Sequence, residues 1–263
     1  MTDAPPLLVI GHPGHEVRVH GWLAETRPTV CVLTDGSGHT ATSRLDASAH
    51  VLAQVGARRG PVFGSLTDRA LYEAIRRGDM ARFVDLARTL AALVVEQRIS
   101  VVVGDAAEGF NPGHDVCRFV IDAAVLLAAQ RGQPAGNFEF VLDAAPGAPA
   151  PGVPRGDARC VTLDDRALDR KLAAARGYLE LRAEVDGALA RFGREAFRHE
   201  WLRPPTTADV VAAWDAEPPF YEQHGRARVA QGVYAEPLTW RDHVRPVFQC
   251  LTQLVERRSC ASS

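Results

Sequence analysis

The chain has 263 residues, of which 46% are hydrophobic and 24% charged, and its formal net charge is −2. This length fits one large α/β domain or two small ones, and the near-neutral charge excludes a general nucleic-acid binder. Apolar runs in the sequence stay well short of the ~20 residues of a membrane span, which argues against a membrane protein.

The first predicted strand is the apolar run Leu7–Ile10, the pattern of a strand buried on both faces of a parallel sheet. Glycine and proline then break the run at Gly11, Pro13 and Gly14, and a helix is expected to begin at about His15. His12 and His15 therefore follow the carboxyl end of a strand, where open α/β sheets place their ligand sites.

The remaining pattern alternates between strands and helices. Further strands are expected at Thr29–Leu33, Pro61–Ser65, Val101–Val103, Phe138–Leu142 and Arg159–Leu163. Helices are expected at Arg69–Arg77, about Asp79–Gln97, about Asp115–Gln130 and Asp164–Arg191, with a proline-rich loop at Ala144–Asp157. We predict a Rossmann-like three-layer α/β sandwich with a largely parallel sheet over 1–165, with a helical and irregular C-terminal region, 166–263, packed on the same domain.

A second turn resembles the first one. The sequence Pro-Gly-His-acid-Val occurs at Pro13–Val17 and again at Pro112–Val116, each time after a buried-strand pattern and before a helical one. Both turns should leave the same edge of the sheet, so His12, His15 and His114 can converge. Neutral imidazoles suit Zn, Fe, Ni or Cu, and three protein ligands with an open fourth position is the catalytic arrangement for zinc. The alternative is that Pro-Gly is a common turn and the repeat arises by chance.

The five cysteines are odd in number and scattered, without a Cys-x-x-Cys pair. This usage indicates reduced, mostly buried thiols and predicts a cytoplasmic protein. Lys171 is the single lysine and follows no glycine-rich turn, which argues against Schiff-base chemistry and a phosphate-loop lysine.

The C-terminal segment 219–247 is rich in aromatic residues and arginine. Its aromatic, histidine and arginine residues include Tyr221, His224, Arg226, Arg228, Tyr234, Trp240, His243 and Arg245. These side chains could close a pocket over a sugar or an anionic substrate, or they could be buried as an ordinary C-terminal extension. The sequence leaves both interpretations open.

Several motifs in order resemble the PIG-L/LmbE-like N-deacetylases. They are the turn His-Pro-x-x-Glu at His12–Glu16, the segment Leu33–Gly36 (Leu-Thr-Asp-Gly) and the late x-Pro-x-His at Asn111–His114. The resemblance covers most of residues 7–145. It implies a zinc-dependent hydrolase, or one using another divalent transition metal, that removes acyl groups from amino sugars and related amides, with a small-molecule substrate.

The departures from the family pattern fall on the site itself. The family turn usually reads His-Pro-Asp-Asp-Glu, with the first Asp as general base and the second as metal ligand; here those places hold Gly14 and His15. The resemblance thus implies His12, His15 and His114 as metal ligands and leaves no side chain at the base position. Replacing an anionic ligand with imidazole raises the net charge of a dication site from about +1 to +2, which should acidify a bound water.

Four carboxylates near the presumed ligands remain proton acceptors to consider: Glu16, Asp105, Glu108 and Asp115. Of these we assign catalysis provisionally to Glu16 and Asp115. The resemblance implies substrate contacts for Asp35, Arg44 and Asp68. Their alternative roles are a polar loop tip, a surface charge and a helix cap, respectively.

The sequence therefore predicts a metal-dependent amide hydrolase acting on an amino sugar or a small amine conjugate. The alternative is a catalytically inactive or repurposed ligand-binding protein on the same scaffold, because the base is missing. A further alternative is a three-histidine site that holds redox-active iron. A homo-oligomer contact through the helix expected at Asp164–Arg191 is left open.

Overall fold

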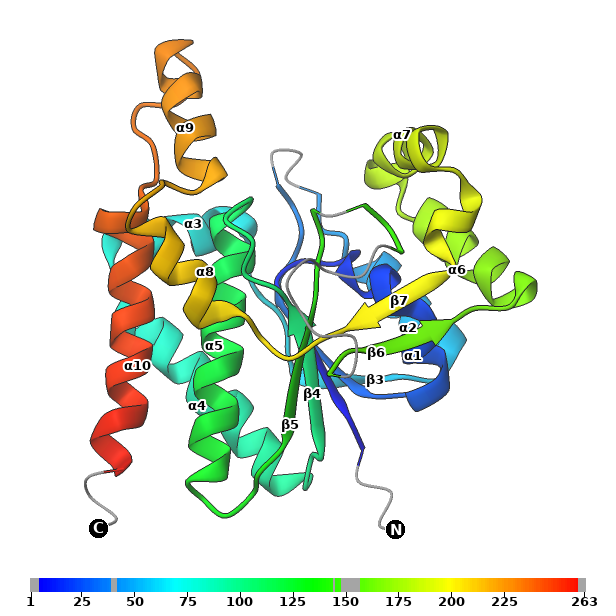
Figure 1. Ribbon diagram of the computed structural model, residues 1–263, viewed down its shortest axis with the longest axis horizontal. Coiled ribbons are helices and arrows are strands. Elements are labelled where there is room, and N and C mark those ends of the chain that lie inside the picture. The colour runs from blue at the N-terminus through cyan, green and yellow to red at the C-terminus, as the bar shows by residue number, and fades with distance from the viewer. Residues whose placement is uncertain (1–4, 39–41, 144, 148–156, 260–263) are drawn as a thin grey trace.

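The computed structural model describes residues 5–38, 42–143, 145–147 and 157–259. A five-stranded sheet in the order β3-β2-β1-β4-β5 forms its centre, and every neighbouring pair of strands is parallel (Figure 1). The strands are β1 (Leu7–Ile10), β2 (Thr29–Thr34), β3 (Arg58–Leu66), β4 (Val101–Asp105) and β5 (Gly136–Phe140). The predicted α/β three-layer fold with a parallel sheet is confirmed.

Side chains of β1 alternate between the two faces of the sheet and so divide the core. Leu7 and Val9 pack with α3 (Asp68–Arg77), α4 (Met80–Glu96), α5 (Pro112–Ala129) and α10 (Arg245–Ser259). Leu8 and Ile10 pack with α1 (His20–Thr26), α2 (Leu45–Val55) and α6 (Asp165–Gly177). All strand residues of β1 and β2 are buried, as the continuous apolar runs predict.

Two expected helix starts differ in the structure. The helix expected from His15 begins as a short 3-10 helix, η1 (His15–Val19), before α1. Helix α5 begins at Pro112 rather than near Asp115, because Asn111 caps it and proline suits a first helical position. His114 therefore lies within the first turn of a helix.

The long helix expected at Asp164–Arg191 is broken. Tyr178 leaves the helical region (φ −79°, ψ 98°), and the chain continues as η2 (Leu179–Leu181) and α7 (Arg182–Phe192). The break places the Tyr178 side chain in the interior, fully buried. The arrangement of one chain does not test an oligomer contact through this segment, which stays a prediction.

The C-terminal region is helical but also holds a strand. After η3 (Arg194–Phe197), β7 (His199–Leu202) pairs antiparallel with β6 (Arg159–Thr162). The helices α8 (Thr207–Trp214), α9 (Phe220–Ala230) and the π-helix η4 (Trp240–Val244) then lead to α10. The division at residue 165 stays a prediction, and most of the expected loop at Ala144–Asp157 lies outside the described residues. Within the described ranges, no helix is long and apolar enough to cross a membrane.

Candidate functional site

The three predicted histidines meet at the carboxyl edge of the sheet. His12 follows β1, His15 begins η1, and His114 lies in the first turn of α5. The ring centroids of His12 and His15 are 5.3 Å apart, those of His12 and His114 5.1 Å, and those of His15 and His114 4.5 Å. Two turns about a hundred residues apart in sequence thus place three imidazoles in mutual contact.

His12 is held by side chains from the end of β2 and the start of α3. Its Nδ1 lies 2.8 Å from Asp68 Oδ1, at the start of α3, and 2.8 Å from Thr34 Oγ1, at the end of β2. Burial opposes ionisation of Asp68, but hydrogen bonds from His12, Thr34 and the Gly38 backbone outweigh it and hold the pKa of Asp68 well below its usual range. Because an ionised carboxylate only accepts, Nδ1 of His12 carries the proton and Nε2 keeps its lone pair.

His15 is also held by a carboxylate at its Nδ1, in this case one from β4. Its Nδ1 lies 2.8 Å from Oδ2 of Asp105, the last residue of β4, and the same oxygen accepts a 2.7 Å hydrogen bond from the Gly11 backbone nitrogen. Asp105 is fully buried. A carboxylate behind a histidine Nδ1 is the arrangement that orients metal-binding imidazoles in proteins.

Burial governs the protonation of the rings. It lowers the pKa of His12, and it lowers the pKa of His114 well below 6.5, with the neighbouring rings adding to the effect at His114. Both imidazoles are therefore neutral at neutral pH, which is the form that binds a metal ion. Nε2 of His12 is buried and has no hydrogen-bond partner.

These residue types and their supporting carboxylates fit a divalent transition metal. Among the described residues, however, no group of three or more His, Cys, Asp or Glu side chains is arranged so that it could hold a metal ion. The three rings are neighbours and do not complete a coordination site in this structure. Metal binding by His12, His15 and His114 stays a prediction.

Gly14, at the family's base position, has a backbone that disfavours any side chain. Its φ is +108°, a conformation that residues with a Cβ rarely adopt. A Cβ at this position would also lie 2.8 Å from Cδ1 of Leu181, in η2. Packing around the turn, as well as the backbone conformation, therefore disfavours a side chain at residue 14.

Glu16, one of the two residues assigned provisionally to catalysis, is engaged elsewhere. Its Oε2 accepts a 2.8 Å hydrogen bond from the Gly14 nitrogen, while Oε1 accepts from the Ser48 hydroxyl at 2.9 Å and from the Tyr178 hydroxyl. Its side chain is fully buried. With three donors on its two oxygens, Glu16 holds the histidine-bearing turn in place, and the geometry argues against the proton-acceptor role.

Asp115, the other catalytic candidate, is fully buried beside His114. Its Oδ1 accepts hydrogen bonds from the backbone nitrogens of Glu108 (2.9 Å) and Gly109 (3.1 Å), and Oδ2 has no partner. Burial outweighs these hydrogen bonds and raises the pKa of Asp115 to about 8. The Glu108 carboxylate is engaged by the backbone, since its Oε2 accepts a 2.6 Å hydrogen bond from the Leu142 nitrogen.

The three residues expected to contact substrate lie around the first turn. Asp68 holds His12, and the cap of α3 is Thr67, so the helix-cap alternative for Asp68 is wrong. Asp35 accepts from the backbone nitrogens of Ser37 (3.0 Å) and Asp68 (3.3 Å) and shapes its own loop. The Arg44 side chain packs against Gly36, with its Nε buried and without a partner. Substrate contact by these three residues stays a prediction.

Sequence reasoning missed Thr34, Ser48 and Tyr178. Thr34 stands beside the Asp35 motif at a strand end, which was a usable signal. Ser48 and Tyr178 carry no motif, because only the packing of α2 and α6 on the first turn brings them to Glu16.

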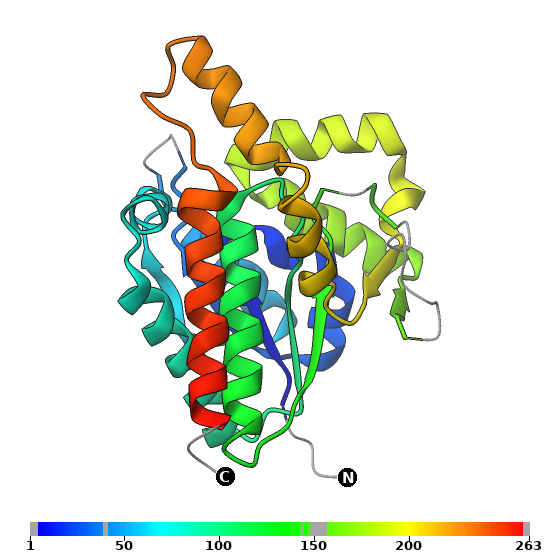
Figure 2. The same ribbon diagram turned by 60° about the vertical axis from the view of Figure 1, so that its left-hand side comes forward.

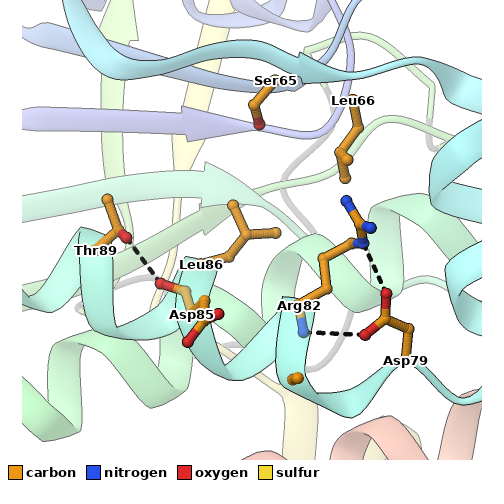
Figure 3. Close-up of a pocket in the computed structure, with 8 residues that line it drawn as sticks. Ser65, Leu66, Asp79, Arg82, Asp85, Leu86 and Thr89 are labelled. Carbon is orange, nitrogen blue, oxygen red and sulfur yellow. Dashed lines mark hydrogen bonds and ion pairs between the residues drawn. The ribbon is translucent and has the colours of Figure 1, made fainter.

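A shallow groove of ≈ 420 Å³ lies away from the histidines, between the end of β3 and α4 (Figure 3). Its charged residues bind one another, since Arg82 Nε donates to Asp79 Oδ2 at 2.9 Å. Thr89 donates to the backbone oxygen of Asp85 at 2.8 Å.

No family model and no curated protein matches the chain. A solved structure with a similar fold is a deacetylase-bog complex in the biosynthesis pathway of teicoplanin, with a TM-score of 0.51 and 16% identity over 76% of this chain and 97% of that one. Another is a triple mutant of a deacetylase in the teicoplanin biosynthetic pathway, with a TM-score of 0.50, 17% identity and the same coverage. The A40926 pseudoaglycone deacetylase is 20% identical over 77% of this chain and 97% of its own, with a TM-score of 0.49. The chain shares the fold of the first two deacetylases.

Proposed function

We propose that this chain is a metal-dependent amide hydrolase, with zinc as the metal favoured by ligand type, that deacylates an amino sugar or a small amine conjugate. The observation that carries the proposal is the meeting of His12, His15 and His114, two of which have a carboxylate behind Nδ1. The fold shared with deacetylases is consistent with it.

The roles follow from the contacts of each group. His12, His15 and His114 would hold the metal, which when bound polarises an amide carbonyl and supplies hydroxide near neutral pH. Asp68 and Asp105 keep the first two rings oriented and aim their Nε2 atoms away from the carboxylates. Asp115 is the candidate that holds a proton beside His114, because its Oδ2 is not engaged by another group.

A second function is favoured by Gly14. A turn that cannot accept the family's base without strain also fits a ligand-binding protein that has lost hydrolysis. On this alternative the histidines bind a metal or a polar ligand and no amide is cleaved.

Metal content and turnover separate the two functions. Purified protein is stripped with a chelator, dialysed against zinc and analysed for bound metal, then assayed on N-acetyl and N-formyl amino sugars. We expect one zinc per chain and amide cleavage, both lost in His114→Ala and both kept in His50→Ala, which removes an exposed histidine of α2. Bound zinc without cleavage of any amide would favour the binding protein, and no zinc in either variant or the wild type would reject the metal site.

A further inference from the structure

Most of the exposed large apolar side chains belong to two segments, the loop before α5 and the region of α9. Among the described residues six large hydrophobic side chains are exposed, and four of them belong to the loop before α5 or to α9 and the turn after it: Phe110, Phe220, Val233 and Tyr234. The Phe110 and Phe220 rings are 44% and 51% exposed, and they stack in parallel, with centroids 5.3 Å apart and an interplanar angle of 2°. We call these two rings the aromatic platform.

The platform is connected to the site through the loop that leads into α5. Phe110 lies four residues before His114 on the same loop and helix start. The neighbouring Gly109 accepts a 3.0 Å hydrogen bond at its carbonyl from the Tyr221 nitrogen and packs closely against Trp214 and Pro219. The loop that carries His114 and the start of α9 are therefore one packed unit. Figures 1 and 2 show α9 rising from the body at the carboxyl edge of the sheet.

Two parallel, half-exposed rings have a specific chemical preference. An offset stack leaves part of each ring face open, and a further aromatic ring can extend the stack while both partners lose apolar surface to water. His224 already lies against Phe220, with centroids 5.8 Å apart, so the row of rings is extended on the side of α9.

We propose that the aromatic platform binds an aromatic group joined to the amine-bearing part of the substrate. The substrate class would then be an aryl-substituted amino sugar or an aryl amine conjugate, rather than a small unsubstituted sugar. This proposal rests on the proposed function for the amide, whereas binding of the aromatic group needs no turnover.

The test compares ligands that lack the amide and so cannot be hydrolysed. Binding of phenyl and methyl glycosides of glucosamine to the zinc-treated protein is measured by calorimetry. We expect the phenyl glycoside to bind roughly 3- to 10-fold more tightly, the range that one aromatic contact supplies. In Phe110→Ala and Phe220→Leu this preference should fall to within about 2-fold, with methyl glycoside binding unchanged.

The control is Leu126→Ala, which removes an exposed apolar side chain of α5 away from the platform and should keep the preference. Thermal melts of all variants establish that each is folded, and the conservative Phe220→Leu keeps apolar bulk while removing the ring. No phenyl preference in the wild type, or a preference that survives both platform variants, overturns the proposal. A phenyl preference without cleavage of any amide supports the platform and rejects the hydrolase. Cleavage without a phenyl preference supports the hydrolase and rejects the platform.

Discussion

Oδ2 of Asp105 lies 2.8 Å from Nδ1 of His15 and 2.7 Å from the backbone nitrogen of Gly11. One buried carboxylate oxygen thus fixes both the end of β1 and the second histidine of the site. In the family that the sequence resembles, the residue at the place of His15 is usually a carboxylate metal ligand. In this chain the carboxylate of Asp105 lies behind the imidazole of His15 instead. Asp68 stands behind His12 in the same way, so two of the three rings are each oriented by a buried carboxyl group.

The first prediction concerns this support. Asp105→Asn keeps the shape of the side chain but weakens its hold on His15, and we expect zinc affinity to fall about 10- to 100-fold. Competition with a chromophoric chelator measures the change. Asp85→Asn, which alters an exposed carboxylate of α4, is the matched control and should leave affinity unchanged. Equal affinities in the Asp105 variant and the wild type would contradict the assignment.

The second prediction concerns the base position. Gly14→Asp restores the family's residue but forces a Cβ into φ +108° and against Leu181, so we expect a loss of about 1–3 kcal/mol in the free energy of unfolding. Adding Leu181→Ala to this variant should restore the part of the free energy that is lost to the collision with Leu181. The part that is lost to backbone strain should remain. Urea unfolding of the two single variants and the double variant measures both parts. A Gly14→Asp protein as stable as the wild type would show that the turn can rearrange.

The third prediction tests the contact between Tyr178 and Glu16. Tyr178→Phe removes a buried hydroxyl that donates to Glu16, and we expect a loss of about 1–2 kcal/mol in the free energy of unfolding, since Ser48 still donates to the same oxygen. Tyr234→Phe, at a half-exposed tyrosine, should cost little. If the two substitutions have the same effect on urea midpoints, the contact is not stabilising.

The fourth prediction is a pH dependence of stability at His20. Burial first, and then the positive charges of Lys171 and Arg170, lowers the pKa of His20 to about 4 from its ordinary 6.5. His20 therefore binds a proton near pH 6.5 in the unfolded chain but only near pH 4 in the folded chain. The titration of His20 therefore leaves the free energy of unfolding at its full value above pH 6.5. It lowers this free energy as the pH falls toward 4, by at most about 3 kcal/mol.

Urea unfolding of the wild type and His20→Gln between pH 7.5 and 4.5 isolates this effect. The difference between the two proteins should change with pH in that window and become constant above it. A constant difference over the whole range would mean that His20 does not titrate differently in the folded and unfolded chain.

The sequence predicted the parts of the fold that depend on local pattern. Leu7–Ile10 and Val101–Val103 are continuous apolar runs, and both are strands of the parallel sheet. The repeated Pro-Gly-His turn predicted that the three histidine rings lie together, because parallel strands end at one edge.

Features that depend on distant packing were beyond sequence reasoning. The predicted helix breaks directly after Gly177, and the contact of Tyr178 with Glu16 depends on residues far apart in the chain, which no local pattern encodes. The same contact occupies Oε1 of Glu16. The positive φ of Gly14 was also hidden, since glycine in a turn is compatible with many backbone conformations.

The hydroxyl of Tyr178 reaches Glu16 across 162 positions of the chain. During synthesis the first histidine turn therefore emerges long before the residue that secures it. Strands β1, β2 and β4 can assemble while the turn still lacks this support, so the first histidine turn is completed only when the end of α6 docks. Substitutions in that late segment can then alter the first turn without touching any histidine.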